Sequence, residues 1–175
     1  QRNFIENAKG EVSPAVNNNF IWNYYHVNQF EQCINDKSWI IYFIYGFFEQ
    51  THCSVYGLRF YVTIIARRNR HFAGTRYLKR GISDEGHVGN DVETEQILEE
   101  ISTTTPDNPI ISSYIHIRGS VPIYWYQIKK RIEPKPDIKI NYSDVFYNAT
   151  RQHFNHLVKR YGHPIIACNL TKKNE

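Results

Sequence analysis

Short apolar runs separated by polar turns dominate the chain, and they predict β-strands. The turn residues Tyr56-Gly57 mark the entry to one of these strands. The predicted strands are residues 20–27, 39–48, 59–66, 110–118 and 121–127. The first three follow one another closely, so they predict an antiparallel layer.

Two helices are predicted in the second half of the chain. Asn90 or Asp91 can cap a helix over residues 92–101, and acidic Glu93 and Glu95 would then lie in its first turn, where the helix dipole favours them. Helices interleaved with strands after Arg67 imply an α/β arrangement there, so the fold class expected for the whole chain is α+β to α/β.

The second predicted helix has clear signals at both ends. Ser143 can cap it, Asp144 suits its first turn and Gly162 can end it. An apolar stripe at helical spacing lies between them, made of Phe146, Ala149, His153, Phe154, Leu157 and Tyr161. Pro164 to Cys168 then predicts a buried strand.

The stretch from Arg67 to Leu98 carries the candidate chemistry. It begins with a cationic segment around Gly74 and Gly81, and it continues with carboxylates from Asp84 to Glu95. Forked guanidinium groups are well suited to bind phosphate, so this order favours an anion site. A solvated loop with dispersed charges is the alternative.

Composition narrows the class of protein. The 175 residues include 13 Tyr and 10 Phe, which favours β structure and argues against disorder. A net charge of +4 permits attraction to anionic membranes but does not argue for nucleic acid. The three cysteines match no zinc pattern and no disulfide framework, which favours reduced thiols in the cytosol. The apolar run from Trp39 to Phe48 is too short to cross a bilayer.

Residue order within several blocks resembles the core signature of the SAC-domain phosphoinositide phosphatases. The blocks are Arg67-Arg68, Ala73-Gly74-Thr75-Arg76, Tyr77, Lys79-Arg80-Gly81, Gly86 through Gln96, and Arg118 through Trp125. Phe20-Ile21-Trp22-Asn23 resembles an earlier family element, and His163-Pro164-Ile165-Ile166 with Asn169-Leu170 resembles a later one. Gly89 and Tyr126 depart from the pattern, and a glycine beside Asn90 loosens the backbone there.

Within this family the chain is most similar to the branch that acts on phosphatidylinositol 3,5-bisphosphate. The resemblance implies an N-terminal SAC subdomain over residues 1–66 and the first, incomplete part of the catalytic subdomain over residues 67–175. It also implies a peripheral endosomal or vacuolar location on the cytoplasmic side, and a complex with a lipid kinase and a scaffold protein. No cofactor, no metal and no nucleic acid is expected.

The family uses a Cys-x5-Arg-Thr loop whose thiolate attacks phosphorus, and no such loop occurs in these 175 residues. We therefore expect this chain to be inactive alone. Cys53 and Arg59 match the bare spacing, but bulky Val55 and Tyr56 lie between them and a strand follows. An anion loop needs small residues and a helix N-terminus, so Cys53 is not expected to be catalytic.

The resemblance and the charge pattern together give five candidate substrate-binding residues, namely Arg76, Arg80, Asn90, Glu93 and Arg118. Arg76 and Arg80 either bind an inositol phosphate or pair with Glu93 and Glu95. Asn90 either orients a catalytic loop or caps a helix. Arg118 either faces a ligand cleft or is an ordinary arginine at a strand end.

The functional hypotheses are three. The first is part of a phosphatase that removes the 5-phosphate of phosphatidylinositol 3,5-bisphosphate. The alternative is a non-catalytic SAC-like interaction module in a lipid kinase and scaffold complex. A nucleic-acid binder that uses the arginine-rich loop is disfavoured by its interleaved carboxylates.

His153 and His156 are spaced i, i+3 without a third ligand nearby in sequence, so packed or surface histidines are expected rather than a zinc site.

Overall fold

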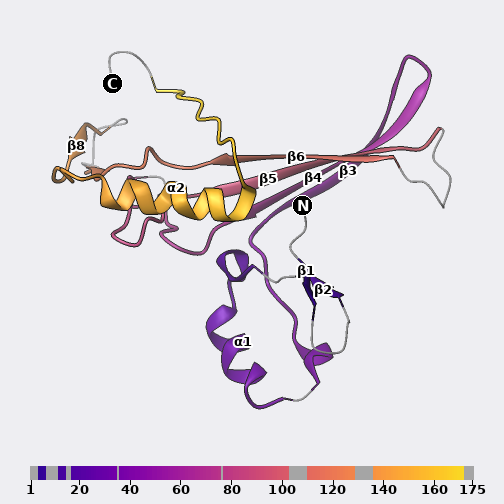
Figure 1. The fold of residues 1–175 in the computed structure, drawn as a ribbon, viewed down its shortest axis with the longest axis horizontal. Helices are drawn as coiled ribbons and strands as arrows, with labels where there is room; N and C mark the ends of the chain where they lie inside the picture. The colour runs from indigo at the N-terminus through magenta and orange to yellow at the C-terminus, as the bar shows by residue number, and fades with distance from the viewer. Residues whose placement is uncertain are drawn as a thin grey trace. The chain divides into compact units, whose positions relative to one another are not determined.

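A computed structural model describes residues 4–6, 12–14, 17–34, 36–75, 77–102, 110–128 and 136–171. These residues form an α+β fold, which confirms the predicted class (Figure 1). Its elements are β1 (Phe4–Glu6), β2 (Val12–Pro14), η1 (Asn18–Phe20), α1 (Tyr24–Glu31), η2 (Lys37–Trp39), β3 (Gly46–Val55), β4 (Leu58–Arg68), β5 (Val92–Glu100), β6 (Ile111–Arg118), β7 (Trp125–Gln127), β8 (Ile138–Ile140) and α2 (Asn148–Tyr161).

The chain divides into two compact units, each built from segments that are distant in sequence. One unit holds residues 19–73 and 90–119, and the other holds residues 1–18, 74–89 and 120–175. The subdomain boundary expected near Arg67 stays a prediction, because compactness within this chain does not define the family's subdomains.

The first unit is built on a four-stranded antiparallel sheet in the order β3-β4-β5-β6. The registers Arg67↔Glu93 and Glu93↔Ile117 align the strands at the end where β4 finishes. Residues directly opposite one another in a sheet share a face, so these registers decide which side chains can meet. The predicted strands 59–66 and 110–118 are confirmed as β4 and β6.

The helix predicted over residues 92–101 is wrong, because this segment is β5. It pairs with β4 on one side and β6 on the other, so both neighbours satisfy its backbone. Asn90 has φ 55, whereas an N-cap residue has extended backbone angles. The alternative that Asn90 caps a helix is therefore wrong.

The strands predicted over residues 20–27 and 39–48 are also wrong in most of their length. The first is the short η1 turn followed by α1, and in the second only residues from Gly46 onward are strand. The apolar side chains of the second run are exposed rather than buried, with Trp39 at 79%. Its backbone is held instead by Asn23, whose side chain donates to the Ile41 carbonyl and accepts from the Phe43 amide, each at 2.9 Å.

The second unit contains α2, the short β7–β8 pair and the loop that carries Gly81 and Gly86. Ile82, Val88 and Ala149 form its buried apolar cluster, so the loop packs against the start of α2. The helix begins at Asn148 rather than after Ser143, and Asp144 accepts a bond from the Ala149 amide at 3.2 Å. The predicted helix end at Gly162 is confirmed, although its φ of 79 and ψ of -163 are not those of a left-handed cap.

Three further expectations in this unit are corrected. Residues 121–127 are strand only from Trp125 onward, and residues 164–168 form no strand and are mostly exposed. In the predicted apolar stripe of α2, Ala149 is buried but Phe146, which precedes the helix, is exposed. Among the described residues, no helix is both long and apolar enough to cross a bilayer.

Candidate functional site

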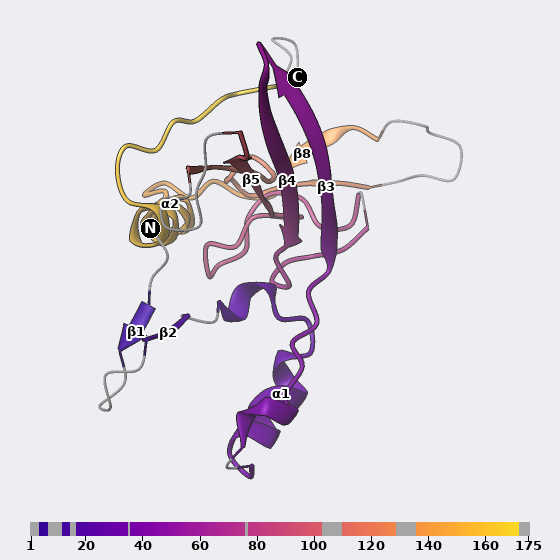
Figure 2. The same cartoon turned by 90° about the vertical axis from the view of Figure 1, so that its right-hand side faces the viewer.

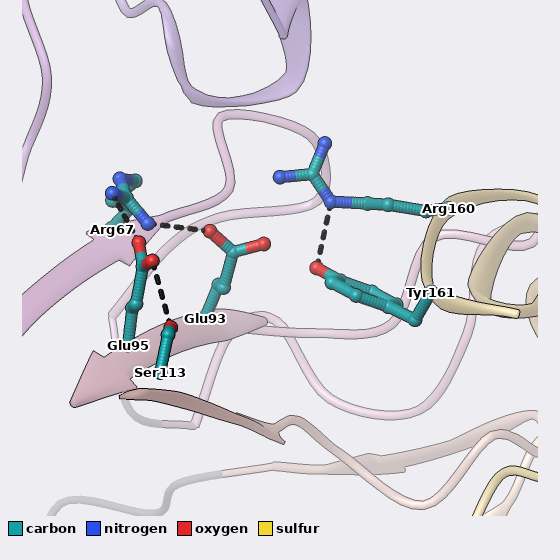
Figure 3. Close-up of polar contacts among 6 residues, drawn as sticks. All are labelled: Arg67, Glu93, Glu95, Ser113, Arg160 and Tyr161. Atoms are coloured by element: carbon teal, nitrogen blue, oxygen red, sulfur yellow. Dashed lines mark hydrogen bonds and ion pairs between the residues drawn. The ribbon is translucent and has the colours of Figure 1, made fainter. Parts of the chain in front are cut away.

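Arg67 anchors a network of charges at the end of β4. Its guanidinium donates to Glu93 and to Glu95 at 2.8 Å each, and the Ser113 hydroxyl donates to Glu95 at 3.0 Å (Figure 3). Burial opposes the charge on Arg67, but the bonds and charges of the two carboxylates outweigh it and raise the pKa of this guanidinium. Arg67 therefore stays cationic and binds both carboxylates.

Glu93 is the most buried acidic residue of this network, with its side chain only 3% exposed. A buried carboxylate needs a cationic partner, and Arg67 supplies one from the neighbouring strand. The structure shows Arg67 as a partner of Glu93 and Glu95, which the sequence did not indicate. Arg76 lies outside the described residues, and the pairing of Arg80 with these carboxylates stays a prediction. The proposed contact of Glu93 with substrate stays a prediction.

Arg68 lies on the opposite face of β4 from Arg67, because successive strand residues alternate. Its guanidinium donates to the Asn90 side-chain oxygen and lies 5.4 Å from the centre of the Tyr45 ring. Its backbone is fixed as well, since its amide donates to the Tyr45 carbonyl at 2.8 Å and its carbonyl accepts from the Trp22 indole at 3.0 Å. These contacts with Asn90, Tyr45 and Trp22 fix the position of Arg68.

Asn90 lies in the turn that leads into β5, and both its backbone and its side chain form hydrogen bonds. Its amide donates to the Phe72 carbonyl at 3.3 Å, while its side chain meets Arg68. Asparagine tolerates its positive φ better than most residues. The proposed role of Asn90 in orienting a catalytic loop stays a prediction.

Arg118 ends β6 and is exposed. The registers Arg68↔Val92 and Val92↔Arg118 place Arg68 and Arg118 on one face of the sheet, two strands apart. Two strand spacings correspond to roughly 10 Å between their Cα atoms. Asn90 precedes Val92 by two residues. Arg68, Asn90 and Arg118 therefore lie at the same end of the sheet.

Arg80 belongs to the other compact unit. Its guanidinium lies 5.8 Å from the centre of the Tyr77 ring and 5.5 Å from that of Trp125. The following Gly81 has φ 72, and a Cβ there would come within 2.6 Å of the Ile123 carbonyl oxygen. The Lys79-Arg80-Gly81 segment is therefore packed tightly against the block that contains Trp125.

Of the five candidates, the structure brings Asn90, Glu93 and Arg118 to the same end of one sheet. Arg76 lies outside the described residues, and a cleft that Arg80 shares with the other three stays a prediction. Sequence reasoning missed Arg68 as a site residue. The available signal was the Arg67-Arg68 pair at a strand end, because alternation sends one arginine to each face.

Cys53 and Arg59, which match the bare spacing of a phosphatase loop, lie in a β-hairpin. Cys53 is on β3 opposite Phe60, and Arg59 is on β4 opposite Ser54. Their backbone groups take part in strand pairing and do not converge on an anion. The prediction that this segment forms a strand is confirmed.

Three histidines lie close together in the second unit. The His153 ring is 3.2 Å from the Gly86 carbonyl, and the rings of His87 and His156 are 5.7 Å apart. Burial lowers the pKa of His153, and the neighbouring charges of His156 and His87 add to this effect, although the bond to Gly86 opposes it. Within the described residues, no three His, Cys, Asp or Glu side chains form a metal-binding group.

Comparison with known proteins identifies the family. The family model described as "SacI homology domain" matches residues 1–175, the whole chain. The chain belongs to the SacI homology domain family. Its two arginines on β4, the Asn90 turn and the Arg118 strand end are therefore features of a SacI homology domain.

Three relatives illustrate the similarity. The chain is 44% identical to phosphoinositide phosphatase SAC5 of Arabidopsis thaliana over 98% of this chain and 22% of that protein. It is 45% identical to the polyphosphoinositide phosphatase of Schizosaccharomyces pombe over 91% of this chain and 20% of the relative. It is 43% identical to phosphatidylinositol-3-phosphatase SAC1 of Arabidopsis thaliana over 100% of this chain and 19% of the relative. The chain thus spans about a fifth of the length of these relatives.

Proposed function

We propose that the protein containing this chain is a phosphoinositide phosphatase that removes the 5-phosphate from phosphatidylinositol 3,5-bisphosphate. The observation that carries the proposal is the similarity of the whole chain to SacI homology proteins that are named as phosphoinositide phosphatases. In this proposal the chain forms one flank of the substrate site, and the attacking thiolate comes from a Cys-x5-Arg-Thr loop elsewhere in the protein. These 175 residues are therefore inactive alone.

The end of the sheet that carries Arg68, Asn90 and Arg118 supports this role. Arg118 is exposed, and Arg68 lies on the same face at roughly twice the strand spacing. A headgroup with two separated phosphates suits two guanidinium groups held apart in this way, because each phosphate accepts charge-assisted hydrogen bonds. Asn90 holds Arg68 in place through its side-chain oxygen.

The substrate also fixes where the enzyme works. Phosphoinositides are membrane lipids, so the proposal includes peripheral attachment to a membrane, and the family resemblance favours the cytoplasmic side of endosomal or vacuolar membranes. The partners proposed from the family resemblance are a lipid kinase and its scaffold protein.

The position of the phosphate that is removed is the point most in need of a test, because one relative is named as a 3-phosphatase. The full-length protein would be incubated with soluble short-chain phosphatidylinositol 3,5-bisphosphate, and the product would be identified by chromatography. We expect phosphatidylinositol 3-phosphate, and no phosphate release by the 175-residue chain. Formation of the 5-phosphate product would contradict the assignment. Absence of hydrolysis, together with binding to a scaffold protein, would favour the interaction module instead.

A further inference from the structure

The hairpin between β3 and β4 extends beyond the strand next to it. Among the residues that the structure describes, the last hydrogen bonds from β4 to the neighbouring segment are at Arg59, whose amide donates to the Ser102 hydroxyl at 2.7 Å and whose carbonyl accepts from the Ile101 amide at 2.9 Å. Past this point the pair Val55↔Leu58 closes the hairpin. Figures 1 and 2 show this end of the two strands projecting away from β5.

Tyr56 lies at the tip of the hairpin, in a turn whose backbone conformation is unfavourable for a tyrosine. It is fully exposed, with a relative accessibility of 102%. Tyr56 and Gly57 have φ values of 50 and 83, so both central residues of this two-residue turn have positive φ, as in a type I′ turn. Asn, Asp or Gly is favoured at the first position, and a bulky residue there is strained. Because the ring is fully exposed, it contributes nothing to the packing of the fold.

The surroundings of Tyr56 are apolar and lack carboxylates in sequence. Val55 and Leu58 are exposed on either side of the turn. From Gln50 to Tyr61 the chain contains no Asp or Glu, while Arg59 contributes a positive charge. On β5, the carboxylate nearest to the turn in the strand register is that of Glu100, which lies opposite Phe60 and not opposite residues 55–58.

We propose that residues 55–58 form a membrane-contacting tip that enters the interfacial layer of a bilayer containing anionic lipids. Tyrosine is suited to this layer because its ring is apolar and its hydroxyl stays hydrated. Val55 and Leu58 bury apolar surface beside it, and Arg59 lies where it meets lipid phosphates. The choice of a bilayer as the occupant rests on the proposed function, since the substrate is a membrane lipid.

The position of the tip also sets the orientation of the sheet. Leu58 and Arg68 are at opposite ends of β4, which corresponds to roughly 33 Å along an extended strand. A headgroup still anchored in the bilayer reaches the Arg68 end only if the sheet lies along the membrane surface. The tip and the substrate site are then two separate points of contact with one bilayer.

The test uses the full-length protein and vesicles of phosphatidylcholine with phosphatidylserine, without phosphoinositide. Tyr56→Asn removes the aromatic ring and places a favoured residue in the turn, so it tests the tip without endangering the fold. Tyr147→Asn is the matched control, because Tyr147 is also exposed with φ 50 but precedes α2. We expect Tyr56→Asn to weaken vesicle binding about tenfold and Tyr147→Asn to leave it within about twofold.

A second variant reports directly on insertion. The fluorescence of Tyr56→Trp, after subtraction of the wild-type spectrum, is expected to shift to shorter wavelength when the vesicles are added. Vesicle binding by Tyr56→Asn as tight as that of the wild type, or an unshifted Tyr56→Trp spectrum on bound vesicles, would overturn the proposal. Hydrolysis of soluble short-chain substrate by the wild type tests the proposed function separately, because that assay contains no bilayer.

Discussion

Arg67 and Glu93 form an ion pair of 2.8 Å across β4 and β5, although they are 26 positions apart in sequence. The same guanidinium binds Glu95, so this arginine of the cationic segment stabilises the sheet. Its neighbour Arg68 points to the other face and reaches Asn90. Arg67 therefore stabilises the fold, whereas Arg68 belongs to the proposed substrate site.

The first prediction concerns this ion pair. Arg67→Ala removes the cation beside Glu93, and a carboxylate left in a buried position is costly. We expect the free energy of unfolding of this chain to fall by about 3 kcal/mol, measured by chemical denaturation. Arg151→Ala, on the exposed side of α2, is the matched control and should change stability by less than about 0.5 kcal/mol. Equal effects of the two substitutions would show that the ion pair does not stabilise the sheet.

The second prediction concerns the Phe20-Ile21-Trp22-Asn23 block. Asn23→Ala removes two side-chain bonds to the Ile41 and Phe43 backbone, so this segment loses its anchor. We expect a loss of about 1–2 kcal/mol in the free energy of unfolding. Asn155→Ala, at an exposed position of α2, is the control and is expected to be nearly neutral. A neutral Asn23→Ala would mean that other contacts hold residues 41–43.

Local signals explain which elements were predicted from the sequence. The turn at Tyr56-Gly57, the strand that follows it and the helix end at Gly162 depend on residues close together in the chain, and all three are confirmed. The acidic start and possible cap of β5 are helix signals. The pairing of this segment with the strands before and after it outweighs them.

In the candidate site, too, some features follow from local sequence signals and others only from contacts between strands. Residue types and motif order make Asn90, Glu93 and Arg118 candidates, but the structure was needed to find the contacts of Asn90 and Glu93. The contact between Arg68 and Asn90 depends on strand register and on a positive φ at Asn90. Alternation along a strand predicts that Arg67 and Arg68 point to opposite faces, but not which of them binds Glu93 and which reaches Asn90.

The third prediction is a pH dependence of stability that arises from His153. Its folded-state pKa is lowered by burial, whereas the unfolded chain titrates near the ordinary value of about 6.5. Above that pH both states are neutral. As the pH falls below it, the unfolded state binds the proton first, and stability decreases until the pH passes the lowered folded-state pKa.

Chemical denaturation at pH values between about 7.5 and about 5.5 would measure this effect. His153→Gln is expected to flatten the decrease in the free energy of unfolding, while His26→Gln, on the exposed side of α1, should retain it. An unchanged pH profile for His153→Gln would exclude this histidine as the source.

The fourth prediction concerns Cys53. Because Cys53 lies in the paired strands of a hairpin, its thiol is not placed to attack a phosphate. Cys53→Ser in the full-length protein is expected to change kcat/KM for phosphatidylinositol 3,5-bisphosphate by less than about twofold. A complete loss of phosphate release in a folded variant would assign the nucleophile to Cys53 and refute the proposed mechanism.

The fifth prediction tests Arg118 as a phosphate-binding residue. Arg118→Gln removes an exposed guanidinium but keeps a polar side chain at the end of β6. If Arg118 binds a phosphate in both the ground state and the transition state, KM rises and kcat changes little. We expect kcat/KM for soluble phosphatidylinositol 3,5-bisphosphate to fall at least about tenfold, since a charge-assisted hydrogen bond is lost.

Arg151→Gln is the matched control for this measurement, because Arg151 is an exposed arginine on α2 outside the proposed site. The control also separates a specific contact from a general loss of positive charge, since both substitutions change the net charge equally. If Arg118→Gln and Arg151→Gln lower kcat/KM by the same factor, Arg118 acts only through the overall field of the protein. A selective rise in KM for Arg118→Gln instead places the headgroup phosphate at the end of the sheet where Arg68 and Asn90 also lie.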